Sequence, residues 1–483
     1  MSTFARVRKI KQAPILEKVL IEDYAAEGKS LARVDGKVIF VEGAVPGDVV
    51  DIQLQKNKAD WAEGFAKTFH SYSEIRVKPF CTHFGVCGGC QWQMLPYSQQ
   101  LIYKHKQVVD NLTRIAKIAL PEIPPIMGAE QTETYRNKVE YTFATERFIP
   151  FEEFRAMKAA GEEPKKSAGA GGFHARGFFE KVVEIDKCYL QAEPTNEMRK
   201  AVVNFALENN MPFYNIKQHQ GWLRNMFVRN TTQGEWMVNL ILGYEDQEKR
   251  EALFTILLDR FPQITTLLYT INAKRNDSMQ DLVPQVYFGN GYITEKLEEF
   301  EFKISPKSFF QTNSKQAERL YQITRDFAEL TGKETVYDLY CGTGSIGIFC
   351  SHQAKKIIGV EVIAEAIEDA KINAQINKLE DTAFFAGDVI DICNDEFFET
   401  HGKPDVIITD PPRAGMHEKL VRKLLEMEAP TIVYVSCNPA TQARDLGLLA
   451  EKYTVTKIQP VDMFPHTLHI ENVVQLKRTT LIN

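Results

Sequence analysis

Several features that would assign a chain to a specialised class are missing from this 483-residue sequence. No run of 18 apolar residues is present, which argues against a membrane-spanning helix. The first 25 residues lack an apolar core and a small-residue cleavage site, so no secretory signal is expected. We therefore expect a cytoplasmic protein. No internal repeat or coiled-coil pattern is evident, and we expect a monomer.

An excess of charge of one sign is also missing. The net charge is −6, so the overall balance does not mark the chain as a nucleic-acid binder. The distribution is uneven, because residues 1–120 carry 17 Lys and Arg against 12 Asp and Glu, whereas the rest carries 41 against 52. The basic front begins with Arg6, Arg8, Lys9 and Lys11, although such a run is more often a solvated terminus than a binding site.

Cysteine is sparse, with eight residues in the chain. In a reducing compartment these cysteines do not form a disulfide framework, so they must serve packing, metal binding or catalysis. The remaining composition, 44% apolar and 25% charged, is that of ordinary globular proteins. A chain of this length exceeds one domain, so two to four domains are expected.

The pattern along the chain predicts a multidomain α/β protein in three parts. Residues 1–70 contain β-rich segments between Gly, Asp and Pro turns, which is typical of a small OB-like barrel. Such barrels bind single-stranded nucleic acid, although a barrel without a ligand fits equally well. Residues 71–310 mix helix and strand signals, as in an α+β domain, with a helix expected over 97–117 and a mobile surface loop over 146–171. Residues 311–483 alternate strands and helices, which predicts a doubly wound, Rossmann-like domain.

Polar residues gather at the ends of the strands expected in this last part. The six expected strands cover 334–340, 355–362, 382–388, 404–410, 431–437 and 457–464. Gly342 and Gly344 belong to a G-x-G-x-x-G turn, a weak signal that fits dinucleotide and S-adenosylmethionine sites alike. Glu361, Asp388 and Asp410 stand at the ends of successive strands, where ligands of open α/β sheets bind. Acidic residues suit a cationic ligand better than a pyrophosphate, and acids that only cap helices are the alternative.

One cysteine lies at the same edge of the expected sheet. Cys437 ends the fifth strand, and a thiolate at a helix start beside a cation such as Arg413 can be activated as a nucleophile. A lone intracellular cysteine is otherwise more often part of the core. His466, His469 and Glu471 follow near the last strand, and each is a candidate general base.

A second group of cysteines stands far from this edge in sequence. Cys81, Cys87 and Cys90 form C-x5-C-x2-C, and Cys188 follows about 100 residues later. The all-thiol set favours a [4Fe–4S] cluster over zinc, because zinc ribbons usually show two C-x2-C pairs. From its spacing alone, Cys188 fits the core as well. A cluster here is expected to staple the fold or to shape an RNA-binding surface.

From about residue 13 to residue 477 the sequence closely resembles the bacterial 23S rRNA uracil-5-methyltransferases that carry a TRAM domain and an iron–sulfur cluster. They belong to the wider family of RNA 5-methyluridine methyltransferases, which includes the tRNA enzyme. The segments that carry the resemblance are GKVIFVEGAVPGD, CGGCQWQMLPYSQQ, ISPKSFFQTN, DLYCGTGSIG, VSCNPAT and HIENV. The resemblance implies a TRAM barrel over 1–70, a central iron–sulfur domain over 71–310 and a class I methyltransferase domain over 311–483. The segment 146–171 departs from the shorter family pattern.

The resemblance also implies a role for each matching residue. The cluster ligands would be Cys81, Cys87, Cys90 and Cys188. The S-adenosylmethionine site would comprise Gln311, Tyr340, Glu361 and Asp410, together with Gly342, Gly344 and Asp388 from the strand-end pattern. Cys437 would add to carbon 6 of uracil, and Glu471 would remove the proton from carbon 5.

The implied reaction is methylation of a uridine in 23S rRNA. The base must leave its stack to meet the thiol, so looped or single-stranded RNA is the expected partner. Three alternatives stay open: the same chemistry on tRNA or on a second rRNA uridine, an RNA-binding or ribosome-assembly factor without turnover, and an NAD-dependent oxidoreductase suggested only by the glycine spacing.

Overall fold

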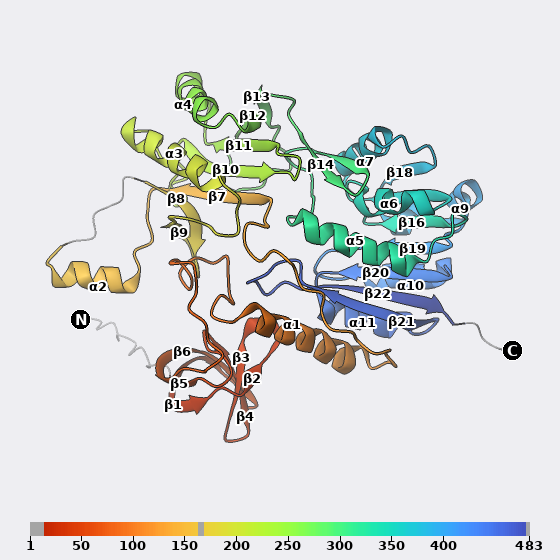
Figure 1. The fold of residues 1–483 in the computed structure, drawn as a ribbon, viewed down its shortest axis with the longest axis horizontal. Coiled ribbons are helices and arrows are strands. Elements are labelled where there is room, and N and C mark those ends of the chain that lie inside the picture. The colour runs from red at the N-terminus through yellow and green to blue at the C-terminus, as the bar shows by residue number, and fades with distance from the viewer. Residues whose placement is uncertain (1–13, 163–168, 480–483) are drawn as a thin grey trace, which may run out of the picture. The chain divides into compact units, whose positions relative to one another are not determined.

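The computed structural model describes residues 14–162 and 169–479 (Figure 1). The basic run from Arg6 to Lys11 and residues 163–168 of the expected loop lie outside these ranges. Within the described ranges, no helix is both long and apolar enough to cross a membrane. The chain divides into two compact units, the first made of Met1–Phe80 with Gln91–Tyr103 and the second of Cys81–Cys90 with Lys104–Asn483.

The first unit is built on a six-stranded sheet in the order β1-β5-β6-β4-β3-β2. Its strands are β1 Ile15–Leu20, β2 Asp23–Tyr24, β3 Ser30–Val34, β4 Lys37–Glu42, β5 Val49–Asn57 and β6 Trp61–Ser71. All pairs are antiparallel except β4 with β6. Apolar residues at alternating positions face one shared core, as the β-rich pattern predicted. Gly47 turns the chain between β4 and β5 with φ +91°, where a Cβ would lie 2.6 Å from Ser73 Oγ.

The helix expected over 97–117 is confirmed. It comprises α1, Tyr97–Asn111, and a π-helical turn over Leu112–Ala116. Lys117 ends it in the left-handed conformation. This helix begins in the first unit and continues into the second.

The second unit contains a central seven-stranded sheet in the order β13-β12-β11-β10-β7-β8-β9. Its strands are β7 Lys138–Ala144, β8 Ala170–Ala175, β9 Phe178–Glu184, β10 Leu223–Asn230, β11 Trp236–Leu242, β12 Ile264–Ile271 and β13 Gln285–Phe288. Helices α3, Thr195–Glu208, and α4, Gln247–Arg260, bury their apolar residues in the same core as alternate residues of β7, β10 and β11 (Figure 1). The other face of β7 carries polar side chains, because successive residues of a strand point to opposite faces.

The segment 146–171 differs from the irregular loop expected from its sequence. Residues Phe151–Ala159 form helix α2, and β8 begins at Ala170. The helix has Glu152 and Glu153 in its first turn and Lys158 in its last, which complements the helix dipole. None of its residues is buried, so the local charge pattern rather than packing favours this helix.

The C-terminal sheet has seven strands in the order β18-β17-β16-β19-β20-β22-β21. They are β16 Thr335–Leu339, β17 Lys356–Glu361, β18 Thr382–Ala386, β19 Val406–Thr409, β20 Thr431–Ser436, β21 Tyr453–Val461 and β22 Glu471–Arg478. The first five are parallel, as the strand–helix alternation predicted. The six expected strands omitted β22, which inserts antiparallel between β20 and β21.

Helices connect the parallel strands of this sheet. They are α5 Ser314–Ala328, α6 Ser345–Cys350, α7 Ala364–Ile376, α8 Val389–Ile392, α9 Asp395–His401, α10 Glu418–Met427 and α11 Pro439–Leu449. A hairpin of β14, Ile293–Leu297, and β15, Phe300–Ile304, precedes α5 and contributes to the same hydrophobic core. The doubly wound architecture predicted for the C-terminal part is therefore present.

Candidate active site

Three of the expected ligand-binding residues form a row at the carboxyl edge of the C-terminal sheet. Strands β16, β17 and β19 are paired in register up to their last residues. Tyr340 donates its backbone N–H to Val360 O at 3.0 Å, and Asp410 donates to Leu339 O at 3.4 Å. Glu361 is the last residue of β17 and is buried. The parallel register therefore brings Tyr340, Glu361 and Asp410 side by side.

The glycine-rich turn after β16 is held against this row. Tyr340, Gly342 and Gly344 all have positive φ angles, of 62°, 53° and 75°. Gly342 N–H donates to Glu361 Oε2 at 3.3 Å. A Cβ on Gly344 would lie 2.9 Å from the ring of Phe384, so this position needs glycine for both its conformation and its space. The turn thus leaves its backbone close to the carboxylates.

A buried carboxyl lies below the turn. Asp338 is 1% exposed, and its Oδ2 accepts a hydrogen bond from Gly347 N–H at 2.8 Å. Its Oδ1 has no hydrogen-bond partner among the described residues. Burial raises the pKa of Asp338 to about 7, opposed by the hydrogen bond from Gly347 and aided by the negative charges of Asp410 and Glu361. Ionisation of this carboxyl is therefore unfavourable.

Two other expected cofactor residues have different surroundings. Asp388 is exposed, and its Oδ1 accepts a hydrogen bond from Ile390 N–H at 2.8 Å. It therefore caps α8, the role that the sequence pattern left open as the alternative to ligand binding. Gln311 is buried, and its backbone oxygen accepts from Asn137 Nδ2 at 3.0 Å. Asn137 thereby fixes the segment that carries Gln311 next to the start of β7.

Cys437 and Glu471 lie opposite each other across two antiparallel strands. Ser436 of β20 pairs with Asn472 of β22 at the end of the ladder. Cys437 is the next residue on one strand and Glu471 the preceding residue on the other, so the register places them face to face. Cys437 is half-buried and Glu471 is 5% exposed. Strand β22, which the sequence pattern did not predict, is therefore the element that brings Glu471 opposite Cys437.

Electrostatic interactions link this pair to the row of acids. Burial raises the pKa of Cys437 to about 12, and the charges of Glu471 and Asp410 raise it further, against a lowering by Arg413. Burial and Asp410 raise the pKa of Glu471 well above its usual range. Burial also raises the pKa of Asp410 to about 7. A bound cation would favour the ionised form of all three groups.

The two histidines proposed as alternative bases occupy other positions. His466 is buried with φ +66°, and burial lowers its pKa to about 4. His469 is an exposed residue. Partial burial of its imidazole ring lowers its pKa, and the positive charge of Arg413 also lowers it. Its ring contacts Phe464 at 6.0 Å between centroids. Among the three candidates, the strand register places Glu471 opposite Cys437.

The four cysteines of the second group gather in one region of the second unit. All four are half-buried: Cys81, Cys87, Cys90 and Cys188. Burial raises the pKa of Cys188 to about 11, and the thiols of Cys87 and Cys81 raise it further. Within the described part of the chain, however, no three His, Cys, Asp or Glu side chains are arranged to hold a metal ion. Cys81 and Cys87 are thus close enough to Cys188 to affect its ionisation, but the described side chains do not form a coordination site as placed.

Two cations that sequence reasoning missed stand opposite each other on the polar face of the central sheet. Lys138 of β7 pairs with Arg229 of β10, and like charges in this position are destabilising. Arg229 is 4% exposed and donates to Ser308 O at 3.1 Å, and neither cation forms an ion pair within the described ranges. Burial lowers the pKa of Arg229 to about 10 and that of Lys138 to about 8. An anion would stabilise this pair.

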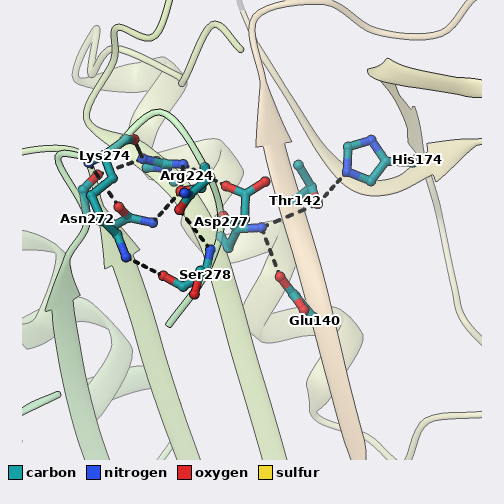
Figure 2. A network of polar contacts seen from close by, with 10 residues as sticks. Glu140, Thr142, His174, Arg224, Asn272, Lys274, Asp277 and Ser278 are labelled. Carbon is teal, nitrogen blue, oxygen red and sulfur yellow. Dashed lines mark hydrogen bonds and ion pairs between the residues drawn. The ribbon is translucent and has the colours of Figure 1, made fainter. Parts of the chain in front are cut away.

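The same face continues into a hydrogen-bonded network away from the two cations (Figure 2). Arg224 donates to the backbone oxygens of Asn272, Lys274 and Asn276 and to the carboxylate of Asp277. These bonds fix the loop after β12. On the neighbouring strands, Asn225 Nδ2 donates to Glu140 at 3.2 Å, and His174 contacts Thr142 at 3.2 Å. This part of the face is therefore polar, although Phe227 of β10 stands opposite Glu140 on it.

Comparisons with known proteins identify the family. An RNA methyltransferase of Bacteroides thetaiotaomicron is 52% identical over 456 residues, which is 94% of this chain and 99% of the relative. An RNA methyltransferase of Porphyromonas gingivalis is 48% identical over 95% of this chain and 99% of the relative. The tRNA (Uracil-5-)-methyltransferase family matches residues 279–479, and the TRAM domain matches residues 17–67. The chain belongs to the uracil-5 RNA methyltransferase family.

A solved structure of this family has the same fold. The tRNA (uracil-54, C5)-methyltransferase of Pyrococcus abyssi, in complex with S-adenosyl-L-homocysteine, is 27% identical and matches with a TM-score of 0.72. The match covers 95% of this chain and 100% of that chain. This uracil-5 RNA methyltransferase is therefore an S-adenosylmethionine-dependent enzyme with an N-terminal TRAM domain and a C-terminal methyltransferase fold. The oxidoreductase and the non-catalytic factor do not fit this family.

Proposed function

We propose that this enzyme methylates carbon 5 of a specific uridine in 23S rRNA through covalent addition of Cys437. The observation that carries the proposal is the strand register that sets Cys437 opposite Glu471. This pair stands beside Asp410 at the same sheet edge as the glycine-rich turn. A nucleophile, a proton acceptor and a row of acids that favours a cation are the three parts that the reaction requires.

The chemistry of uracil explains why a thiol is needed. Carbon 5 is a poor nucleophile until Cys437 Sγ bonds to carbon 6 and the ring becomes an enolate. S-adenosylmethionine supplies the electrophilic methyl group that carbon 5 then takes. Glu471 accepts the proton from carbon 5, and the electron pair of that C–H bond re-forms the C5–C6 double bond. The bond between Sγ and carbon 6 breaks in the same step, and the thiolate leaves.

The acidic residues prepare the site for a cationic methyl donor. Glu361 and Asp410 stand close enough to Asp338 to raise its pKa. A positive charge among these three carboxyls is therefore favourable. The same positive charge and Arg413 oppose the effects of burial and of the Glu471 and Asp410 charges, which together raise the pKa of the Cys437 thiol. Burial raises the pKa of Glu471, so its carboxylate, once ionised beside the bound cation, is a stronger base for the proton of carbon 5. The remaining proposed cofactor contacts are Gln311, Tyr340, Gly342, Gly344 and Asp388.

The RNA substrate is supported by two independent features. TRAM strands form the first unit, and Lys138 and Arg229, which form no ion pair among the described residues, suit a phosphate group. We assign 23S rRNA because the sequence resembles the TRAM-bearing enzymes that act on it, and this substrate places the reaction in the cytoplasm. The relative from Pyrococcus abyssi acts on tRNA, which makes tRNA the second candidate. Mass-spectrometric mapping of 5-methyluridine in rRNA and tRNA incubated with the purified enzyme and cofactor distinguishes them.

The nucleophile is tested with the variant Cys437→Ala. We expect it to lose methyl transfer to RNA while it still binds S-adenosylmethionine in calorimetry. The matched control is Cys393→Ala, which removes a buried thiol between α8 and α9 and should keep its activity. Full methylation by Cys437→Ala would refute the covalent route.

We further propose that Cys81, Cys87, Cys90 and Cys188 together hold a [4Fe–4S] cluster. Four thiols are the usual ligand set of such a cluster, and the electrostatic effect of Cys81 and Cys87 on the ionisation of Cys188 supports the proximity of these three. The four side chains would have to converge to close the site. Purification without oxygen, followed by iron, sulfide and zinc determination, tests this. A colourless protein with one zinc and no iron would refute the cluster.

A further inference from the structure

Helix α11 begins directly after the proposed nucleophile and carries a stripe of polar residues on its buried side. The α11 stripe consists of Asn438, Thr441, Gln442 and Asp445, at the spacing i, i+3, i+4 and i+7 of one helix face. Gln442 and Asp445 are both 0% exposed. Buried polar side chains are costly unless they are hydrogen-bonded, so the partners of this stripe show its purpose.

Part of the stripe holds the loop that follows Asp410. Asn438 Nδ2 donates to Arg413 O at 3.1 Å, and Thr441 Oγ1 donates to the same oxygen at 3.3 Å. Asp445 Oδ2 accepts from Met416 N–H at 2.8 Å. The loop can approach the helix because Gly415 has φ +75° and no side chain, whereas a Cβ there would lie 2.8 Å from Asp445 Oδ2.

Gln442 connects the strands of the two proposed catalytic residues. Its Nε2 donates to Tyr434 O at 3.0 Å and to Asn472 O at 3.1 Å. Its Oε1 accepts from Asn472 Nδ2 at 2.7 Å. Tyr434 lies on β20, which leads to Cys437, and Asn472 follows Glu471 on β22. The side chain of Gln442 is thus hydrogen-bonded to both strands at the end of the ladder, where Cys437 and Glu471 face each other.

The end of a β-ladder is where strands separate most easily. Beyond Ser436 and Asn472, no further backbone pair joins β20 to β22. The hydrogen bonds of Gln442 restrain the distance between Cys437 and Glu471 at this point. We propose that Gln442 is a positioning residue, which holds Glu471 where it can take the carbon-5 proton from the base bound to Cys437. This inference rests on the proposed function.

The variant Gln442→Met tests the proposal, because methionine has a similar size but cannot make the three hydrogen bonds. If Glu471 is misplaced, elimination slows and the covalent link between enzyme and RNA persists. With ordinary uridine RNA and S-adenosylmethionine, we expect turnover to fall about 10–100-fold, the range for a catalytic group displaced by about 1 Å. We also expect a rise in the enzyme–RNA complex that survives denaturing electrophoresis. The affinity for S-adenosylmethionine should change less than about twofold, because Gln442 does not contact the acids at that site.

The matched control is Gln475→Met on β22, the strand that begins with Glu471. Gln475 is also buried, and it donates to Phe327 O at 2.6 Å and accepts from Thr456 Oγ1 at 2.6 Å. Its loss should lower stability similarly without raising the amount of covalent complex. Asn472→Ala removes only one of the three bonds of Gln442 and should show a smaller rise, which keeps the test valid if Gln442→Met does not fold.

The variants distinguish a failure of the proposed function from a failure of the positioning role of Gln442. If Cys437→Ala still methylates RNA, the proposed function fails whatever Gln442 does. If Cys437→Ala is inactive but Gln442→Met and Asn472→Ala accumulate no more covalent complex than Gln475→Met, only the positioning role is overturned. A raised covalent complex in both variants, with cofactor affinity retained, supports it.

Discussion

Replacing the buried Asp338 by asparagine should stabilise the ligand-free enzyme at high pH and much less at low pH. Asp338 is 1% exposed, and one of its carboxylate oxygens has no partner within the described ranges. Its pKa rises from 3.8 to about 7 on folding. A carboxyl with a raised pKa favours folding less as the pH increases, because the folded state resists ionisation. Its cost therefore grows between pH 4 and pH 7 and is constant above.

The size of the effect follows from the shift in pKa. One pKa unit corresponds to about 1.4 kcal/mol. Relative to the unfolded state, the raised pKa of Asp338 therefore destabilises the folded state by about 4 kcal/mol at pH 8 and by about 2 kcal/mol at pH 5. Asp338→Asn removes this cost at both values of pH. The variant leaves one amide N–H without an acceptor, which costs about 1–3 kcal/mol at either pH. The net gain should thus be about 2–3 kcal/mol larger at pH 8 than at pH 5.

Thermal unfolding of wild type and Asp338→Asn at pH 5 and pH 8 measures this difference. For a large domain, about 2–3 kcal/mol corresponds to a rise of roughly 4–12 °C in the difference between the two midpoints. The variant should also bind S-adenosylmethionine more weakly at pH 8, because a carboxylate near the cation is lost. Asp326→Asn, on α5, is a control in which an aspartate outside the acidic row is changed.

The reasoning would be refuted by a difference in midpoint that does not depend on pH, or that is larger at pH 5. Either result would show that Asp338 is not forced to ionise in an unfavourable environment. An unchanged affinity for S-adenosylmethionine would remove Asp338 from the electrostatic environment of the cofactor.

Two further predictions concern binding. Because the pKa of Asp410 is about 7, its protonation below that pH removes a negative charge from the site, and the Kd for S-adenosylmethionine should rise up to tenfold per pH unit towards pH 5. Calorimetry should show this trend in wild type and a weaker trend in Asp410→Asn, where Asp338 still titrates, and an equal trend in both would contradict it. Lys138→Gln should weaken RNA binding and reduce the slope of log affinity against log salt by about 1. Lys371→Gln, an exposed lysine of α7, serves as the control, and equal slopes for the two variants would exclude Lys138 from the phosphate contacts.

Local patterns in the sequence determine much of the architecture and part of the site. The alternation of apolar segments predicts the parallel strands, because each strand is buried on both faces and each crossover needs a helix. The glycine turn predicts a close approach of the backbone, and the structure has Gly342 and Gly344 in the left-handed region. Glu361 and Asp410 fall at strand ends, so their gathering follows from the parallel arrangement alone. Their roles as cofactor contacts stay predictions.

Tertiary structure alone decides the contacts that depend on distant partners. Strand β22 takes its place between β20 and β21 through antiparallel pairing, which a local pattern does not encode. This pairing sets Cys437 against Glu471 and lets Gln442 clasp the ladder end. The opposition of Lys138 and Arg229 likewise arises from the pairing of two strands that are far apart in the sequence. Short-range periodicity reports which face of an element is buried, whereas the identity of the neighbour across the sheet depends on how the whole chain is folded.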